Sequence, residues 1–301
     1  MKSAYIKMHI AIFLWGFTGL LGKLIELNEG MLVWYRLLIS SVAIAIILLY
    51  RKSFPKISSK EIISISLIGF LVMLHWITFY GSIKLSGISV AMICLSSIAL
   101  FASILEPLVN KTRFDYIEIF FSALAVTGIM TIYNSDAGLA KGIIVGIISA
   151  LLSACFSILN KRIASKYETL TISLIELSSG WLLLTLLLPL YFLIQPTETF
   201  LPSTSDFVYL MILSLFCTVL TWVLSLQALR KVSAYTMGLA LNLEPVYGII
   251  LAIAFAGEGK LMNGGFLSGA AIIMITIILH TIYKWKKLKK PPEKSIGPMM
   301  N

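Results

Sequence analysis

Charged residues are scarce in this sequence: they make up 13% of its 301 residues, where soluble domains have about 25%. Apolar residues make up 58%, above the roughly 45–50% of soluble domains. So few charges cannot cover the surface of a soluble protein of this length. The composition therefore excludes an ordinary soluble fold and indicates a chain embedded in a lipid bilayer.

Patterns typical of enzymes and metal sites are also lacking. The three cysteines, Cys94, Cys155 and Cys217, lie in apolar blocks and are interpreted as small hydrophobic residues without a disulfide or metal role. The motifs G-x-S-x-G and H-E-x-x-H and a phosphate-binding glycine loop are absent. We therefore expect no cofactor, no bound metal and no pumping driven by ATP.

What the sequence does contain is a series of about ten apolar blocks. Each has roughly 18–25 residues, enough to cross about 30 Å of hydrocarbon as a helix. The first block starts close to Met1 and has no A-x-A-like cleavage site, so it is interpreted as a retained helix. The predicted fold class is an all-α integral membrane protein. The blocks lie near 4–22, 31–50, 61–83, 87–109, 115–133, 140–160, 170–194, 207–228, 233–256 and 264–283.

Basic residues gather on one side of the predicted membrane. With the N-terminus in the cytoplasm, nineteen of the 24 Lys and Arg residues fall on the inner side, four fall on the outer side, and Arg36 lies inside the second block. This bias follows the positive-inside rule and predicts a multi-pass protein of the cell (inner) membrane with both termini cytoplasmic. The segment "YKWKKLKK" (283–290) is then expected to face anionic lipid rather than nucleic acid.

The ten predicted helices divide into two halves of five. "SIKLSGISVAM" (82–92) is similar to "ALRKVSAYTMG" (228–238), and "FFSALAV" (120–126) to "FLSGAAI" (266–272), at an offset of about 144–146 residues. An odd number of crossings per half inverts the second half, which is the design of transporters with a site near the membrane midplane. The expected division is a first repeat over 1–135, a second over 136–290 and a cytoplasmic tail over 291–301.

Three segments carry a resemblance to a known family. "AIFLWGFTGLLGK" (11–23), "VWYRLLIS" (33–40) and "LEPVYGIILAIAFAGE" (243–258) resemble EamA-type members of the drug/metabolite transporter superfamily, and the resemblance covers nearly the whole chain. It implies two inverted five-helix repeats around a central cavity, and export or exchange of small metabolites. The first repeat departs from the family pattern, because it has "LEPLVNKTR" (105–113) where a Gly-Glu is frequent.

A carboxylate and a helix breaker stand side by side at Glu244 and Pro245, inside the ninth block. Pro245 has no N–H for the carbonyl of Leu241, so we expect a kink and a free backbone acceptor in the membrane. Glu244 is interpreted either as a residue for substrate contact or proton carriage, or as a packing device that caps the freed backbone. Tyr247 shares its stripe of the helix.

Arg36 lies about 8 Å in from the outer end of its helix. From there it could snorkel to the headgroups, or it could act as a gate or as the anchor of a substrate carboxylate. Aromatic residues near the midplane supply the other candidates, with Trp76 and Tyr80 on one helix face. The candidate cavity residues are Trp15, Arg36, His75, Trp76, Tyr80, Glu244 and Tyr247.

Four polar residues lie in the inner third of their predicted helices: Glu106, Asn160, Glu176 and Gln227. They are candidates for a cytoplasmic gate. The alternative for Glu106 is a simple ion pair with the nearby Lys111 and Arg113.

The predicted function is a secondary transporter for small polar metabolites, amino acids or related compounds, which works by alternating access. Its partners are a small-molecule substrate and the bilayer, proton coupling is a candidate, and the protein is expected to be a monomer or homodimer. The alternative cargo is a sugar, a nucleotide-sugar or a lipid-linked compound, although nucleotide cargo needs several cavity cations and only Arg36 is intramembrane. An intramembrane enzyme is the remote alternative, because no Asp lies inside a block except near an end.

Overall fold

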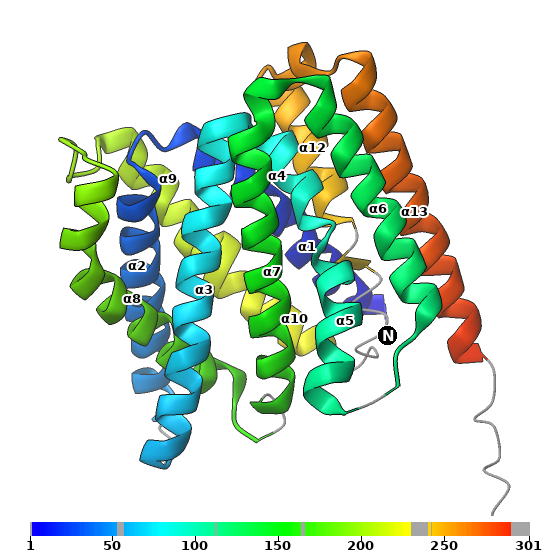
Figure 1. The fold of residues 1–301 in the computed structure, drawn as a ribbon. Helices are drawn as coiled ribbons and strands as arrows, with labels where there is room; N and C mark the ends of the chain where they lie inside the picture. The colour runs from blue at the N-terminus through cyan, green and yellow to red at the C-terminus, as the bar shows by residue number, and fades with distance from the viewer. Residues whose placement is uncertain are drawn as a thin grey trace, which may run out of the picture.

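The computed structural model describes residues 2–52, 57–111, 113–163, 166–229, 240, 241 and 243–289, and these form helices and loops without a strand (Figure 1). The predicted tail over 291–301 lies outside the described residues. The helices are α1 (Lys2–Leu24), α2 (Glu29–Tyr50), α3 (Ser59–Ser86), α4 (Ile88–Leu95), α5 (Ile98–Asn110), α6 (Tyr116–Ser135), η1 (Ala137–Leu139), α7 (Ala140–Ile163), α8 (Thr169–Ile194), α9 (Thr204–Ser214), η2 (Leu215–Leu220), α10 (Thr221–Leu229), α12 (Glu244–Phe255), η3 (Glu258–Leu261) and α13 (Gly264–Lys289).

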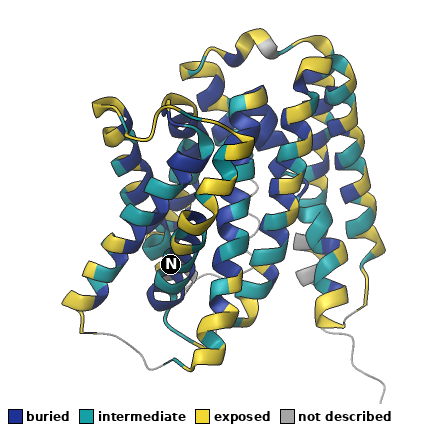
Figure 2. Ribbon diagram, turned by 60° about the vertical axis from the view of Figure 1, so that its left-hand side comes forward, coloured by how far each residue is buried: buried dark blue, intermediate teal, exposed yellow. Residues whose placement is uncertain are grey.

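These helices confirm the predicted all-α membrane fold. Within the described residues, nine helical segments are long and apolar enough to cross a membrane, and α12 is a shorter apolar helix of 12 residues in the ninth predicted block. Large apolar side chains such as Leu186 and Leu193 stand exposed on the outside, where only lipid could shield them from water. Figure 2 shows the matching pattern, with buried surfaces turned toward the middle of the bundle.

The fourth predicted block, 87–109, is not one continuous helix. α4 ends at Leu95 and α5 begins at Ile98. Between them, the Ser96 hydroxyl donates to the carbonyl of Ile93 and the Ser97 hydroxyl to that of Cys94, each at 2.6 Å. Serine hydroxyls that bond the local backbone compete with the regular helical pattern, which explains why the helix is interrupted at these two residues.

The two halves run through the membrane in opposite senses. α1 begins at the end of the bundle where α13 finishes, which we call the terminal face (Figure 1). Five crossings later, α7 begins at the other end, the opposite face, so the second half is inverted. The halves also interlock: α3 packs along α7 and α8, α6 along α13, and α1 against α10 and α12.

A ridge of small residues lets α7 approach α3 and α4 closely. Gly142, Gly146, Ala150 and Ala154 recur every four residues, and all are buried. A Cβ atom on Gly146 would lie 2.8 Å from Ser82 Oγ and 2.8 Å from the Cβ of Cys94, so only glycine fits there. This close approach brings the side chains of α3 within hydrogen-bond distance of the α7 backbone.

A buried carboxylate joins the two halves at the opposite face. Glu258, at the start of η3, accepts the backbone N–H groups of Ile88 at 2.6 Å and Ser89 at 2.8 Å. These are the first N–H groups of α4, which have no partner within their own helix and lie at its positive end. Gly87, at a φ of 93°, makes the turn that exposes them. We call this contact the Glu258 cap.

We predict that Glu258→Gln destabilises the protein by about 1–2 kcal/mol, because an amide oxygen replaces one charged acceptor and the helix loses its counter-charge. Thermal unfolding in detergent measures the effect as a lowered midpoint. Glu198→Gln is the matched control, since Glu198 is an exposed glutamate in the loop after α8. Equal midpoints for the wild type and both variants would contradict the stabilising role of the cap.

Candidate functional site

A cavity of about 610 Å³ lies inside the bundle, and both halves contribute to its wall. The residues contributed by α6, α12 and α13 come from the parts of those helices nearer the terminal face. Those contributed by α2 and α3 come from the halves nearer the opposite face. The cavity therefore extends from the level of Arg36 toward the terminal face, and the break between α4 and α5 contributes Ser96 and Ile98 to its wall.

Arg36 is held at one end of the cavity by three side chains. Its guanidinium carbon lies 3.7 Å from the centroid of the Trp76 ring. Nη1 donates to Tyr80 Oη at 2.7 Å, and Nε donates to Thr218 Oγ1 at 3.1 Å. The side chain is only 4% exposed, so Arg36 does not snorkel to the headgroups. The aromatic face and two hydrogen bonds to neutral groups offset part of the cost of burying this cation.

Thr218 reaches Arg36 because it lies in a π-helical turn, η2, between α9 and α10. Its hydroxyl donates to the carbonyl of Leu213, five residues earlier, at 3.0 Å, and accepts from Arg36. Single π-turns inside α-helices are frequent at functional sites. Sequence reasoning missed Thr218, because a π-turn leaves no periodic signal in an apolar run.

Part of the Arg36 guanidinium remains available to a ligand. A guanidinium has five N–H donors, and the hydrogen bonds to Tyr80 and Thr218 use two of them. Nη2 has no hydrogen-bond partner among the described residues, and the side chain lines the cavity. The arrangement suits a carboxylate, which guanidinium groups bind through two parallel hydrogen bonds.

Glu244 and Pro245 both line the cavity, and the expected kink involves Asn242, which lies outside the described residues. α12 starts at Glu244, with Leu243 as its N-cap residue, so Pro245 lies in the first helical turn. A proline is well placed there, because the N–H groups of the first turn have no helical acceptor. Glu244 interacts electrostatically with Arg36 across the cavity.

His75 also lines the cavity, and α7 fixes its orientation. Nδ1 lies 2.9 Å from the carbonyl oxygen of Ser149 and 2.9 Å from its hydroxyl. The ring stacks on Phe79 at 6.1 Å between centroids and lies against Phe156 at 5.4 Å. Ser149 lies beside the small-residue ridge of α7, next to Ala150, and its role at the site was not predicted.

The remaining candidates for the cavity divide into two groups. Trp15 and Trp76 are part of its wall. Tyr80 and Tyr247 are not among the described residues that line it. Tyr80 is fully buried behind the cavity wall and acts through its bond to Arg36. Tyr247 packs edge-on against Phe13, in the contact between α12 and α1.

The four candidate gate residues do not form one cluster. Glu106 pairs with Lys161 of α7 at 2.5 Å, which corrects the expected partners Lys111 and Arg113. The C-terminal end of α7 packs beside α5, whereas Lys111 ends α5 in a left-handed conformation.

Two further contacts hold the other gate candidates. Glu176 is buried, only 2% exposed, and lies close enough to Asn160 to interact with it. Gln227 accepts from Lys7 Nζ at 2.8 Å and so links α10 to α1 at the terminal face.

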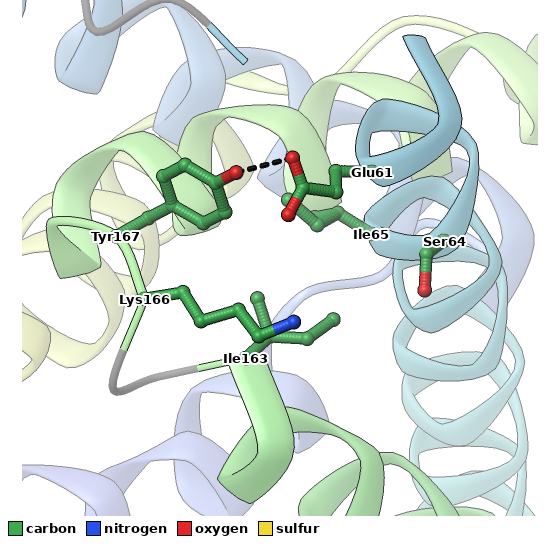
Figure 3. Close-up of a pocket in the computed structure, with 6 residues that line it drawn as sticks. All are labelled: Glu61, Ser64, Ile65, Ile163, Lys166 and Tyr167. Carbon is green, nitrogen blue, oxygen red and sulfur yellow. Dashed lines mark hydrogen bonds between the residues drawn. The ribbon is translucent and has the colours of Figure 1, made fainter. Parts of the chain in front are cut away.

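A second hollow at the terminal face is too small for a metabolite. Figure 3 shows it between α3, the end of α7 and the turn before α8, with a volume of about 50 Å³, room for only a few water molecules. Tyr167 donates to the Glu61 carboxylate across it, and this bond raises the pKa of Tyr167. Within the described residues there is no group of three or more His, Cys, Asp or Glu that could hold a metal ion.

The comparisons with known proteins agree with this architecture. The family model for EamA-like transporters matches residues 2–134 and, a second time, residues 140–282. The chain belongs to the EamA-like transporter family. The two matched segments correspond to the two inverted halves.

The individual relatives share little sequence identity with the chain. Over 268 residues the chain is 26% identical to an uncharacterized transporter, YetK, of Bacillus subtilis (strain 168), and this covers 83% of the chain and 78% of the relative. A protein of known crystal structure matches 96% of the chain and all of its own length, with a TM-score of 0.63 and 15% identity. That likeness concerns the fold alone.

Proposed function

We propose that this transporter exports or exchanges small metabolites that carry a carboxylate, most of all amino acids and related compounds, by alternating access. The observation that carries the proposal is the buried Arg36, whose unused donors border a cavity of about 610 Å³ inside the membrane. Burying a cation at this depth is costly, so a retained arginine beside a cavity favours recognition of an anionic group. Such a volume suits a molecule of amino-acid size or somewhat larger.

The alternative cargo, a sugar or nucleotide-sugar, receives less support. A nucleotide diphosphate carries at least two negative charges and is typically bound by several cations or a metal ion. Among the described residues that line the cavity, Arg36 is the one Lys or Arg side chain. The walls near it are largely apolar and aromatic, which suits one charged group attached to an apolar body.

The position of the cavity supports an alternating-access cycle. At the opposite face, Lys84 donates to the carbonyls of Ile25 and Leu27, and the Glu258 cap ties the two halves together. At the terminal face, the contacts lie between neighbouring helices and are largely exposed. We infer that in this conformation the cavity takes up or releases substrate at the terminal face. The Glu258 cap must then open when the cavity becomes accessible from the opposite face.

We also propose that the terminal face is cytoplasmic, in the cell (inner) membrane, and that the functional units are the repeats 1–135 and 136–290 with a tail over 291–301. The charge bias along the sequence supports the orientation. The family match at 2–134 and 140–282 supports the division. Within the membrane, Arg36 and Glu244 are the residues to which we assign substrate and proton binding.

The orientation predicts the compartment of two reporter fusions. A fusion after Asn301 should be active only with a cytoplasmic reporter, and one in the loop over 195–203, between α8 and α9, only with a periplasmic reporter. Paired reporters that fluoresce or fold on one side of the membrane measure both. A periplasmic C-terminus would contradict the orientation.

Arg36→Lys should be inserted and folded but should bind a carboxylate substrate roughly 10–100-fold more weakly, since an ammonium lacks the planar pair of donors. Arg36→Ala should lose binding entirely. Binding of amino acids to the purified protein, after a growth screen with toxic amino-acid analogues, measures the effect. Lys141→Ala, at the exposed start of α7, is the control. Normal transport by Arg36→Ala would remove Arg36 from the site.

Glu244→Gln tests proton coupling, because the amide keeps the shape of the carboxyl group but cannot release a proton. We expect this variant to fold and bind substrate, and to lose uptake against a concentration gradient when a pH gradient is imposed on reconstituted vesicles. Exchange of labelled for unlabelled substrate should persist. Glu198→Gln is again the control. Undiminished gradient-driven uptake by Glu244→Gln would make the carboxyl group structural, with coupling elsewhere or absent.

A further inference from the structure

The hydrogen bonds of His75 determine which ring nitrogen carries a proton. A backbone carbonyl can only accept, so the contact of Nδ1 with the Ser149 carbonyl at 2.9 Å requires a proton on Nδ1. The Ser149 hydroxyl donates in turn to the carbonyl of His75 at 3.1 Å, which leaves its oxygen as a second acceptor for Nδ1. In a neutral ring, Nε2 is therefore a bare acceptor.

Nε2 has no hydrogen-bond partner among the described residues, although the ring is part of the cavity wall. Phe79 stacks on the ring and Phe156 lies against it, so the aromatic contacts use its faces and leave its edge. The Nδ1 edge is turned to α7. The edge that carries Nε2 is the one left to meet a ligand in the cavity.

The neighbour of this acceptor is the Arg36 site. His75 is adjacent in sequence to Trp76, whose ring centroid lies 3.7 Å from the guanidinium carbon, and both His75 and Arg36 line the cavity. A second proton on the ring would place another cation beside Arg36 in a buried site, which electrostatics disfavours. The wall thus presents a donor group and an acceptor group next to each other.

We propose that His75 is a specificity-determining residue: its Nε2 accepts a hydrogen bond from an N–H group that the substrate carries next to its carboxylate. This inference rests on the proposed function, since Arg36 must hold the carboxylate. An α-amino acid matches the pair, with the carboxylate on Arg36, the ammonium on His75 and an apolar side chain against the aromatic walls. A carboxylate without the amine leaves Nε2 buried and unpaired, and such a loss discriminates strongly between ligands.

The test compares L-leucine with 4-methylpentanoate, which is the same molecule without its amino group, in binding to the purified full-length transporter in detergent. The wild type should bind leucine roughly 10-fold or more tightly than the analogue. His75→Asn keeps a side-chain N–H at the position of Nδ1, so it can retain the bond to Ser149, while it loses the acceptor and the ring contacts with Phe79 and Phe156. It should weaken leucine to the level of the analogue and leave the analogue unchanged.

Two controls separate this role from packing and from the proposed function. His75→Gln, which restores an acceptor near the position of Nε2, should recover part of the preference for leucine. Arg36→Lys should weaken both compounds equally, because both carry the carboxylate. If His75→Asn weakens both compounds equally, or leaves their ratio unchanged, the assignment of His75 is overturned while the Arg36 site stands.

Binding of the two compounds to the wild type is decisive by itself. If leucine and the analogue bind equally to the wild type, His75 does not recognise the amino group, whatever the variants show. If neither these compounds nor any other proteinogenic amino acid binds, the proposed function fails, and the assignment of His75 fails with it.

Discussion

The need to bury a guanidinium inside a membrane organises the centre of this protein. A charge at this depth must be given partners, and Arg36 takes them from both halves: Trp76 and Tyr80 come from α3, and Thr218 comes from the π-turn of the second half. Arg36 therefore connects the two repeats and also lines the cavity. A ligand that draws the guanidinium into the cavity must compete with these contacts. Binding at Arg36 therefore affects the packing of α2 against α3 and η2.

Local sequence patterns predicted the part of this site that lies on one helix. The i, i+4 spacing of Trp76 and Tyr80 correctly placed both rings on a single face of α3, and both contact Arg36. The depth of Arg36 in its helix left two interpretations open, and only packing decided between them. Burial in the membrane depends on which helices surround a residue, and no pattern within one helix contains that information.

The features that sequence patterns missed depend on an irregular helical turn or on contacts between distant segments. Thr218 needs an extra residue in a helical turn, and Ser149 needs the close approach of α7 to α3. The expected kink at Pro245 stays a prediction, because Asn242 lies outside the described residues, while Pro245 itself is well suited to the first turn of α12. Glu106 pairs with Lys161 rather than with Lys111 or Arg113, because α7 packs beside α5.

At the offset between the repeats, the sequence of the first repeat has no acidic residue that corresponds to Glu258. The offset of 144–146 residues relates Glu258 to Thr112, Arg113 and Phe114, and none of these side chains is an acid that could cap a helix N-terminus. The two ends of an inverted-repeat protein would be closed by equivalent contacts if its halves were identical. Here the opposite face is closed by a carboxylate bonded to two backbone N–H groups, whereas the contacts described at the terminal face include exposed pairs such as Glu106–Lys161. Exposed ion pairs contribute little, typically below about 1 kcal/mol. The difference in chemistry between the two ends therefore favours the conformation seen here, in which the cavity lies toward the terminal face.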